Sequence, residues 1–182
     1  MSCDANQNTE LVFQTTRLSV RRLEESDFEA FHEMQSDDEV MRYTSGNGFD
    51  ETENKRQLKA CIADYSIPEN CFGVWAIVRK SDLQFVGTCA IVLNKNRPEI
   101  GYRFLRKFFG LGYGKEICDG LIEYGIHELS LQEIIAFADI RNVASIKILD
   151  RSRLSFIKEV KNEEGATDRF YRWSSGPATK IQ

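Results

Sequence analysis

Three glycines at alternate positions, Gly110, Gly112 and Gly114, are the part of this sequence that most directly suggests chemistry. They stand in the run GLGYGKE (residues 110–116), which follows a β-rich run and precedes a stretch with helical spacing. The free backbone N–H groups of such a turn and of the first helical turn, aided by the helix dipole, can bind a pyrophosphate. Glycines leave room for that approach. The alternative is an ordinary strand–turn–helix joint, for which one or two glycines suffice.

Two familiar phosphate-binding motifs do not fit this run. A P-loop, G-x-x-x-x-G-K-[ST], would put Phe109 at its first glycine and Glu116 at the hydroxyl residue that binds magnesium. A dinucleotide fingerprint, G-x-G-x-x-G, would need a glycine at Lys115. The run therefore predicts either a pyrophosphate held by backbone groups alone or an ordinary strand–turn–helix joint.

Composition argues against several classes of function. The chain has 182 residues, which suggests one domain, and its net charge of −4 gives no reason to expect nucleic acid as a partner. Five cysteines without C-x-x-C spacing indicate reduced thiols in a cytoplasmic protein, and only two histidines argue against a zinc site. No apolar run approaches the roughly 18 residues that span a membrane, so a membrane partner is not expected.

The apolar pattern predicts an α/β (α+β) domain with a largely antiparallel sheet. The run Ser26-Asp27-Phe28-Glu29 is typical of a capping box that begins a helix. Residues 1–14 are expected to be a flexible leader, 15–175 a single domain and 176–182 a tail. Strands are expected at 17–23, 71–78, 85–93, 99–105, 133–139, 154–160 and 169–173, and helices from Ser26, around 58–65, after the glycine run as far as Leu129, and at 142–151.

Five segments, in the same order, resemble a known family. The chain is similar to GNAT-fold, acetyl-CoA-dependent N-acetyltransferases, of the branch that includes the ribosomal-protein N-terminal (alanine) acetyltransferases. The resemblance covers about residues 15 to 173 and implies a mixed, mostly antiparallel sheet of about seven strands flanked by about four helices. It is carried by TTRLSVRRLEESDFEAFHEM, by SDDEVMRYTS, by the strands FGVWAIV, FVGTCAIV and EIGYRF, by FFGLGYGKEI, and by NVASIKIL.

The resemblance implies acetyl-CoA as co-substrate and no metal. The pyrophosphate would rest on backbone N–H groups of the glycine run, and the strand before it would splay from its neighbour and pair with the pantetheine arm. Asn142 would hydrogen-bond the cofactor. The cofactor-binding residues so implied are Tyr102, Arg103, Phe104, Gly110, Leu111, Gly112, Tyr113, Gly114, Lys115 and Asn142.

Acetyl transfer to an amine needs a base, a polarised carbonyl and a thiolate that can leave. Glu99 is the candidate base, because a carboxylate can take the ammonium proton, often through water. It could instead begin a strand or pair with an arginine, and Glu163 and Glu164 are the alternative bases. A backbone N–H near Phe104 would polarise the carbonyl. Ser145 is the candidate donor to the leaving sulfur, or else a satisfied surface hydroxyl.

Tyr43, Phe49 and Trp75 stand on segments that flank the acceptor cleft in this branch, although Trp75 could be a core residue because it lies mid-strand. The expected function is acetyl transfer to a protein N-terminus or a small amine, by direct attack in a ternary complex. A catalytically silent acyl-CoA-binding sensor or regulatory module is the alternative. The oligomeric state stays open; dimers are common in the family, so a homodimer is one option.

Overall fold

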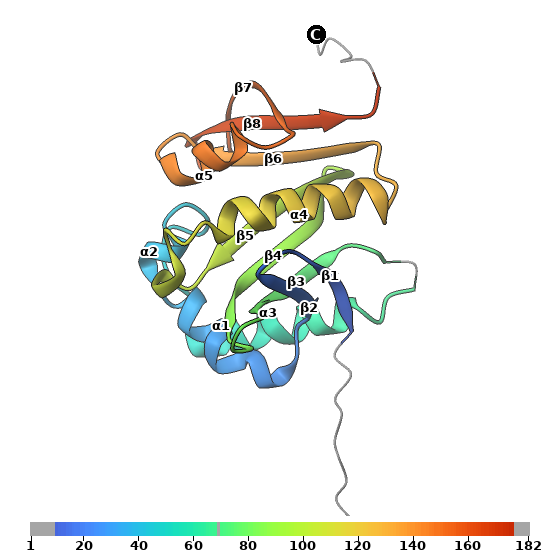
Figure 1. Ribbon diagram of the computed structural model, residues 1–182. Coiled ribbons are helices and arrows are strands. Elements are labelled where there is room, and N and C mark those ends of the chain that lie inside the picture. The colour runs from blue at the N-terminus through green and yellow to red at the C-terminus, as the bar shows by residue number, and fades with distance from the viewer. Residues whose placement is uncertain (1–9, 69, 177–182) are drawn as a thin grey trace, which may run out of the picture.

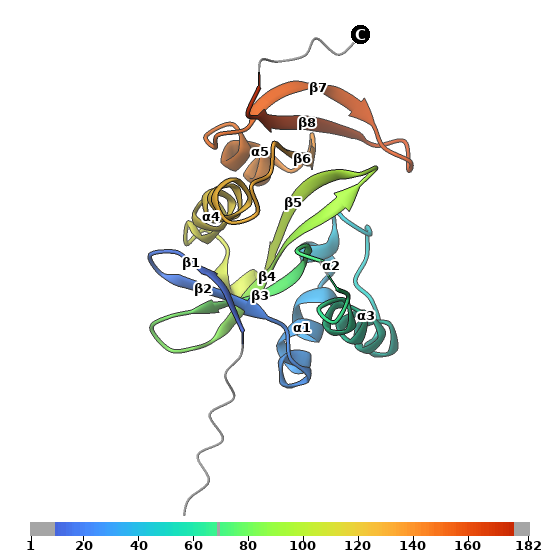
Figure 2. The ribbon, with the colours of Figure 1, turned by 90° about the vertical axis from the view of Figure 1, so that its right-hand side faces the viewer.

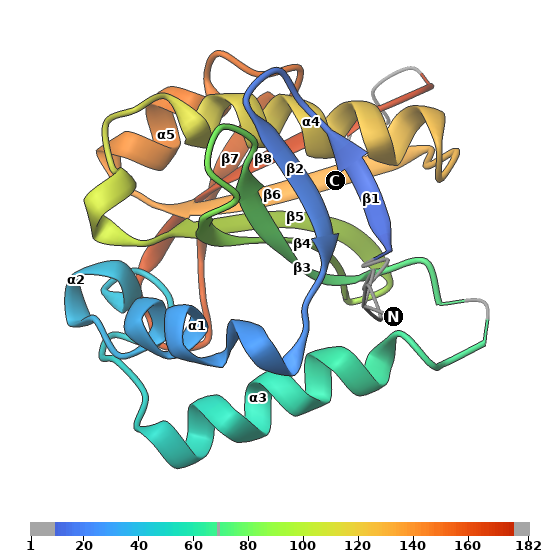
Figure 3. The ribbon, with the colours of Figure 1, turned by 60° about the horizontal axis from the view of Figure 1, so that its bottom comes forward.

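The computed structural model describes residues 10–68 and 70–176, which build one eight-stranded sheet in the order β1-β2-β3-β4-β5-β6-β8-β7. Helices α4 and α5 lie on one side of the sheet, and α1 and α3 lie on the other (Figures 1–3). The elements are β1 (Leu11–Gln14), β2 (Leu18–Arg22), α1 (Phe28–Gln35), α2 (Asp38–Met41), α3 (Glu51–Asp64), β3 (Gly73–Arg79), β4 (Phe85–Asn94), β5 (Arg97–Phe104), α4 (Tyr113–His127), β6 (Glu133–Asp139), α5 (Val143–Leu149), β7 (Ser155–Lys161) and β8 (Thr167–Ser174).

The seven predicted strands are confirmed within two residues at each end, and β1 is an eighth strand that was not expected. The prediction of a flexible leader through residue 14 is wrong for Leu11–Gln14, which pair antiparallel with β2. Four residues of mixed polarity are too short for a clear alternation, and only Val12 and Phe13 pack against the core. Residues 1–9 of the expected leader, and 177–182 of the expected tail, lie outside the described residues.

The start of α1 also differs from the prediction. A short 3-10 turn, Glu25–Asp27, precedes the helix. Asp27, not Ser26, closes this turn: its Oδ2 accepts the N–H of Glu24 at 2.9 Å and its carboxylate pairs with Arg21 at 2.7 Å. The Ser26 hydroxyl donates to the Glu24 carboxylate instead. A buried carboxylate that meets both a backbone N–H and a guanidinium is the stronger cap.

The β4–β5 hairpin sets the position of the candidate base. Its two-residue turn, Lys95-Asn96, has both residues in the left-handed region, with φ of 50° and 63°. Turns of this kind match the twist of the strands that they join. The register Asn94↔Arg97 then continues through all eight residues of β5 without a bulge. Side chains therefore alternate regularly along β5.

The core is divided between the two faces. One cluster joins β2, β3, β4, β5, β6 and β8 to α4, and a smaller one joins β3 and Leu23, just after β2, to α1 and α3. Of the described cysteines, Cys89 and Cys118 are buried, and all four are free thiols. No helix in the described ranges is both long and apolar enough to cross a membrane. Residues 10–68 and 70–176 also contain no group of three or more His, Cys, Asp or Glu placed to hold a metal ion.

Candidate active site

Strands β5 and β6 diverge at the centre of the sheet. They are parallel neighbours, but within these two strands the only register pair is Glu99↔Ile135. On its other edge β5 pairs with β4 along its whole length. Beyond this bridge, from the carbonyl of Ile100 onward, the N–H and C=O groups of β5 that point toward β6 therefore lack a sheet partner. An extended ligand arm with amide groups could take those hydrogen bonds, as an added strand does. Figure 2 shows the two strands separating.

The glycine run follows the open end of β5 and begins α4. Gly110 and Gly112 have φ of 77° and 81°, a conformation that glycine adopts freely, and Gly112 is the N-cap of the helix. The first N–H groups of a helix have no intrahelical acceptor. Within the described chain, the backbone N–H groups of residues 110–115 make no hydrogen bond. They are available to an anion, and the positive end of the α4 dipole favours one.

Gly114 has a different use. A Cβ at this position would lie 2.7 Å from Cδ1 of Ile148 and 3.7 Å from Cε2 of Tyr102. The bare backbone thus allows the first turn of α4 to pack closely on α5 and on the ring of Tyr102. The three glycines therefore serve two purposes: the first two shape the turn, and the third permits close packing.

The turn between β1 and β2 is fastened to the glycine run. The carboxylate of Glu116 accepts hydrogen bonds from Thr15 Oγ1 at 2.6 Å and from the backbone N–H and Nε of Arg17, both at 2.7 Å. Arg17 Nη1 also donates to the carbonyl of Leu111 at 2.9 Å. Burial by itself would raise the pKa of Glu116, but these hydrogen bonds together lower it. We call Thr15, Arg17 and Glu116 the loop latch.

Two predicted cofactor residues on this run have side chains that are already engaged. Tyr113 is buried, with its ring against Phe104 and Phe108 and beneath the guanidinium of Arg17. Lys115 pairs with Asp119 one helical turn away. The Tyr113 side chain is thus enclosed, whereas the Lys115 side chain is partly exposed in its ion pair. The side chain of Leu111, by contrast, is exposed.

On the other side of the divergence, Asn142 and Ser145 begin α5. Asn142 is the N-cap: its Oδ1 accepts the N–H of Ser145 at 3.1 Å, which leaves its amide Nδ2 to donate elsewhere. Tyr102 reaches toward this turn from β5. Its hydroxyl is buried and makes no hydrogen bond within the described residues. Burial raises the pKa of Tyr102 strongly, and the neighbouring Ser145 offsets only part of that rise.

From the sequence, Tyr102 is expected only to pair with the pantetheine arm. A role for its buried hydroxyl was not predicted. A buried phenol without a partner is costly, so such a group calls for an explanation. The raised pKa keeps it protonated at neutral pH, which makes it a standing O–H donor. The regular alternation of side chains along β5 could have indicated it, because it puts Ile100, Tyr102 and Phe104 on the same face of the strand.

Glu99 lies on the opposite face of β5, half-buried. Burial raises the pKa of its carboxyl, the hydrogen bond from Asn94 Nδ2 at 2.7 Å acts the other way, and the negative charge of Asp168 adds to the rise. Asp168 was not among the sequence candidates. It comes from β8, opposite Asp139 of β6, and burial followed by the charge of Asp139 raises its pKa as well, against a hydrogen bond from Asn162. No local pattern in the sequence indicates this approach.

The alternative bases, Glu163 and Glu164, are exposed in the turn between β7 and β8. Glu164 is close enough to Asp168 to raise the pKa of that carboxyl. It does not appear among the groups that shift the pKa of Glu99. Of the three sequence candidates for the base, Glu99 alone is partly buried and lies beside the divergence.

The three predicted acceptor residues have different surroundings. Tyr43 follows α2, and the guanidinium of Arg141, just beyond β6, lies 5.9 Å from its ring centre. Phe49 is half-buried, and its backbone is tied to Gln35 of α1 at 2.8 Å. Trp75 is only 4% exposed and meets Tyr124 of α4 edge-on, with ring centres 5.9 Å apart. Trp75 is a core residue and is not available to an acceptor.

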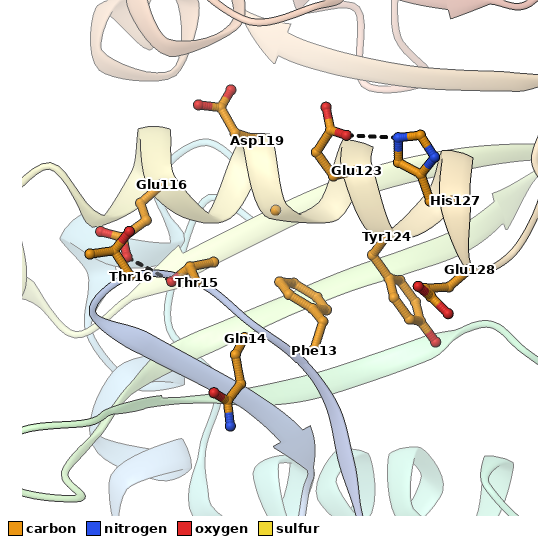
Figure 4. A pocket seen from close by; sticks show the side chains of 11 residues that line it. Phe13, Gln14, Thr15, Thr16, Glu116, Asp119, Glu123, Tyr124, His127 and Glu128 are labelled. Atoms are coloured by element: carbon orange, nitrogen blue, oxygen red, sulfur yellow. Dashed lines mark hydrogen bonds and ion pairs between the residues drawn. The ribbon is translucent and has the colours of Figure 1, made fainter.

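A hollow of about 490 Å³ lies between β1 and the outer side of α4 (Figure 4). Its rim is acidic, but three of its carboxylates are paired: Glu116 in the loop latch, Asp119 with Lys115, and Glu123 with His127 and Arg153. It is separate from the divergence of β5 and β6. We assign it no part in the chemistry.

The acetyltransferase (GNAT) domain family matches residues 17–155. The chain belongs to the GNAT acetyltransferase family. It is 33% identical over 148 residues to p20 of Bacillus licheniformis, an uncharacterized N-acetyltransferase, with 80% of this chain and 82% of that protein covered. The predicted family, fold and enzyme class are thereby confirmed, and the protein is an N-acetyltransferase.

Solved structures share the fold at lower identity. A GNAT-family acetyltransferase from Bacillus anthracis superposes with a TM-score of 0.78 at 22% identity, covering 88% of this chain and 96% of that one. RimL, a ribosomal L7/L12 α-N-protein acetyltransferase solved in complex with coenzyme A, gives a TM-score of 0.76 at 15% identity, covering 91% and 98%. At these identities the likeness shows the fold alone.

Proposed function

We propose that this enzyme moves an acetyl group from acetyl-CoA to a primary amine, a protein N-terminal α-amine or a small amine, by direct attack in a ternary complex. The observation that carries the proposal is the continuity of two open backbone surfaces. The unpaired edge of β5 is followed, after one 3-10 turn at Arg106–Phe108, by the unbonded N–H groups of residues 110–115. The edge of β5 suits an arm that contains amide groups, and the N–H groups of residues 110–115 suit a pyrophosphate. Coenzyme A carries its pantetheine arm and its pyrophosphate in the same order.

The cofactor would be held mainly by backbone. Pantetheine amides would pair with β5 along Tyr102, Arg103 and Phe104, and the pyrophosphate would rest on the turn from Gly110 to Lys115. The Nδ2 of Asn142, left free by the cap, would donate from the α5 side. GNAT enzymes use acetyl-CoA, and RimL was solved with coenzyme A, which supports this placement.

The reaction would proceed in one displacement. Glu99, directly or through water, takes a proton from the acceptor ammonium, and the neutral amine nitrogen attacks the thioester carbonyl carbon. The C–N bond forms and the C–S bond breaks, while a backbone N–H near Phe104 stabilises the developing oxyanion. The thiolate of coenzyme A leaves and takes a proton from the hydroxyl of Ser145 or of Tyr102, and the second proton that the attacking nitrogen loses as the amide forms restores that hydroxyl through water. No covalent enzyme intermediate is needed.

The test is thiol release from acetyl-CoA with a panel of amines, run beside isothermal titration with acetyl-CoA. The panel holds N-terminal peptides, amino acids, polyamines and aminoglycosides. We expect tight cofactor binding and amine-dependent thiol release, with the acetylated product confirmed by mass. Binding without release for any member of a broad panel would favour the alternative, a silent acyl-CoA-binding module. Failure to bind acetyl-CoA would overturn both.

A further inference from the structure

Arg103 shares a face of β5 with the candidate base. Glu99, Gly101 and Arg103 are alternate residues of a strand without a bulge, so their side-chain positions lie on the same side. The side chain of Arg103 points among α1, α2 and α3: its Nη1 donates to Gln35 Oε1 at 2.6 Å and approaches Met41 Sδ at 3.4 Å. The guanidinium of Arg103 therefore lies on the face of β5 that bears Glu99, which we call the acceptor side.

This guanidinium has no carboxylate partner. On the same face, Arg97 and Arg172 both pair with Glu133, and just beyond β6 Arg141 pairs with Asp139. Among the arginines in the described part of the chain, only Arg103 and the exposed Arg151 form no salt bridge. Arg103 is the one that lies in the interior of the acceptor side.

The electrostatic situation of Arg103 favours an anion. Burial lowers the pKa of its guanidinium, and the amide of Gln35 supplies a dipole but no countercharge. Its Nε and Nη2 make no hydrogen bond within the described residues, and the residue as a whole is only partly buried. A largely buried cation is costly unless it is paired. A ligand anion would supply the missing partner.

The space between Glu99 and Arg103 is open. A Cβ on Gly101 would meet no atom within 4 Å. Arg103 lies four residue steps along the strand from Glu99, so their Cα atoms are about 13 Å apart. An acceptor lying across Gly101 could present its amine to Glu99 and a second group to Arg103.

We propose that the acceptor carries an anionic group, a carboxylate or a phosphate, several bonds away from its amine, and that Arg103 binds this group. The inference rests on the proposed acetyl transfer and narrows its substrate class. It favours acceptors such as an acidic peptide or an ω-amino acid, in which amine and anion are well separated. It disfavours polyamines, which would bring a second cation to Arg103.

The experiment compares acceptors that differ only in the anion. The pairs are 5-aminopentanoate with 5-aminopentanamide, 4-aminobutyl phosphate with 4-aminobutanol, and the peptide amide Ala-Ala-Glu with Ala-Ala-Gln. We expect the anionic member of at least one pair to have a kcat/KM roughly 10- to 100-fold higher, the range for a hydrogen bond to a charged group. The pair with the largest ratio identifies whether the anion is a carboxylate or a phosphate and whether a peptide carries it.

Two variants make the assignment specific. Arg103→Gln should reduce kcat/KM for the anionic acceptor toward that of its neutral counterpart, while the neutral counterpart changes less than about threefold. Arg103→Lys keeps the charge and should retain part of the preference. Arg151→Gln, at the other arginine without a salt bridge, is the control and should leave every ratio unchanged. The melting temperature and acetyl-CoA affinity of each variant are measured alongside.

The failure of this inference differs from the failure of the proposed function. If wild-type enzyme acetylates the neutral and anionic members of every pair equally well, the anion site does not exist but acetyl transfer stands. An equal loss for both members in Arg103→Gln, with a lower melting temperature, would mean that Arg103 only braces Gln35 of α1. If no amine in any pair is acetylated, the proposed function itself fails.

Discussion

Arg17 holds Glu116 through two hydrogen bonds of 2.7 Å, one from its backbone N–H and one from Nε, and also reaches the carbonyl of Leu111. The turn after β1 is thereby fixed to both the glycine run and the first turn of α4. Although Arg17 is half-exposed, its guanidinium also covers the ring of Tyr113. The loop latch thus joins a strand that the sequence pattern did not indicate to the turn that is proposed to hold the pyrophosphate.

Arg17→Ala should weaken acetyl-CoA binding by about tenfold, because the loop would lose the charge-assisted hydrogen bonds that order it before binding. Isothermal titration measures the affinity, and Lys55→Ala, which removes a surface ion pair on the distant α3, is the control. We expect the melting temperature of both variants to fall by only a few degrees, as is typical of exposed pairs. Equal affinities in Arg17→Ala and wild type would show that the latch does not order the loop for the cofactor.

Gly112→Asp should abolish measurable acetyl-CoA affinity, because it places a carboxylate beside the pyrophosphate. Gly112 has a positive φ, so any side chain brings some strain. Gly112→Asn is the matched control: Asn is as large as Asp, tolerates the left-handed conformation and carries no charge. A Cβ here would meet only Arg17 Nη2, at 3.4 Å, so the first side-chain atom is accommodated equally in both variants. Similar affinities for the two variants would mean that the turn binds no anion.

The order of strands and helices could be predicted from the sequence because each element is a local pattern. The seven longer strands have clear runs of β-branched and aromatic residues, and α4 has a regular apolar face. β1 was missed because four residues carry too little pattern. The carboxylate that closes the turn before α1, that of Asp27, is held by Arg21 of β2. Both features depend on contacts between segments that are separate in the sequence, not on a pattern within one segment.

The site was predictable only in part, for the same reason. The glycine run and Glu99 stand out locally, whereas the approach of Asp168 to Glu99 arises from pairing across the sheet. The sequence does not reveal which face of β5 each side chain joins, so Arg103 was placed with the cofactor although its guanidinium lies among α1, α2 and α3. Trp75 was placed beside the acceptor, although it packs against α4.

Tyr102→Phe should lower kcat with little change in acetyl-CoA affinity, because the ring that packs on α4 is kept and only the buried hydroxyl is removed. If Tyr102 and Ser145 share the protonation of the thiolate, each single change should cost about tenfold and Tyr102→Phe/Ser145→Ala clearly more. Single-turnover rates separate this step from binding. A more stable Tyr102→Phe with an unchanged rate would identify the hydroxyl as an unsatisfied core group without a part in catalysis.

Glu99→Gln should lower kcat roughly 10²–10⁴-fold at neutral pH, because the amide cannot accept a proton. The wild-type rate should rise with pH through the pKa of Glu99, which burial places above its usual value. This acidic limb should be absent in the variant, whose rate rises only as the acceptor amine loses its own proton. Asn94→Ala is the companion variant: it removes the hydrogen bond that opposes the rise, so its acidic limb should shift to higher pH. An acidic limb that persists in Glu99→Gln would move the base to Asp168 or to the exposed Glu163 and Glu164.

The raised pKa of Glu99 also predicts how the free energy of unfolding of wild type, compared with that of Glu99→Gln, changes with pH. Because folding raises the pKa of Glu99, its ionised form is disfavoured in the folded protein. Its stabilising contribution is thus complete at pH values below the unfolded pKa and is lost as the pH rises through the folded pKa. Relative to Glu99→Gln, wild type should have the lower free energy of unfolding at pH 7, and the difference should shrink toward pH 5. Denaturant titrations of both proteins at the two pH values measure this, and a difference that grows on acidification would show that Glu99 is stabilised as a carboxylate, with the pKa shift in the opposite direction.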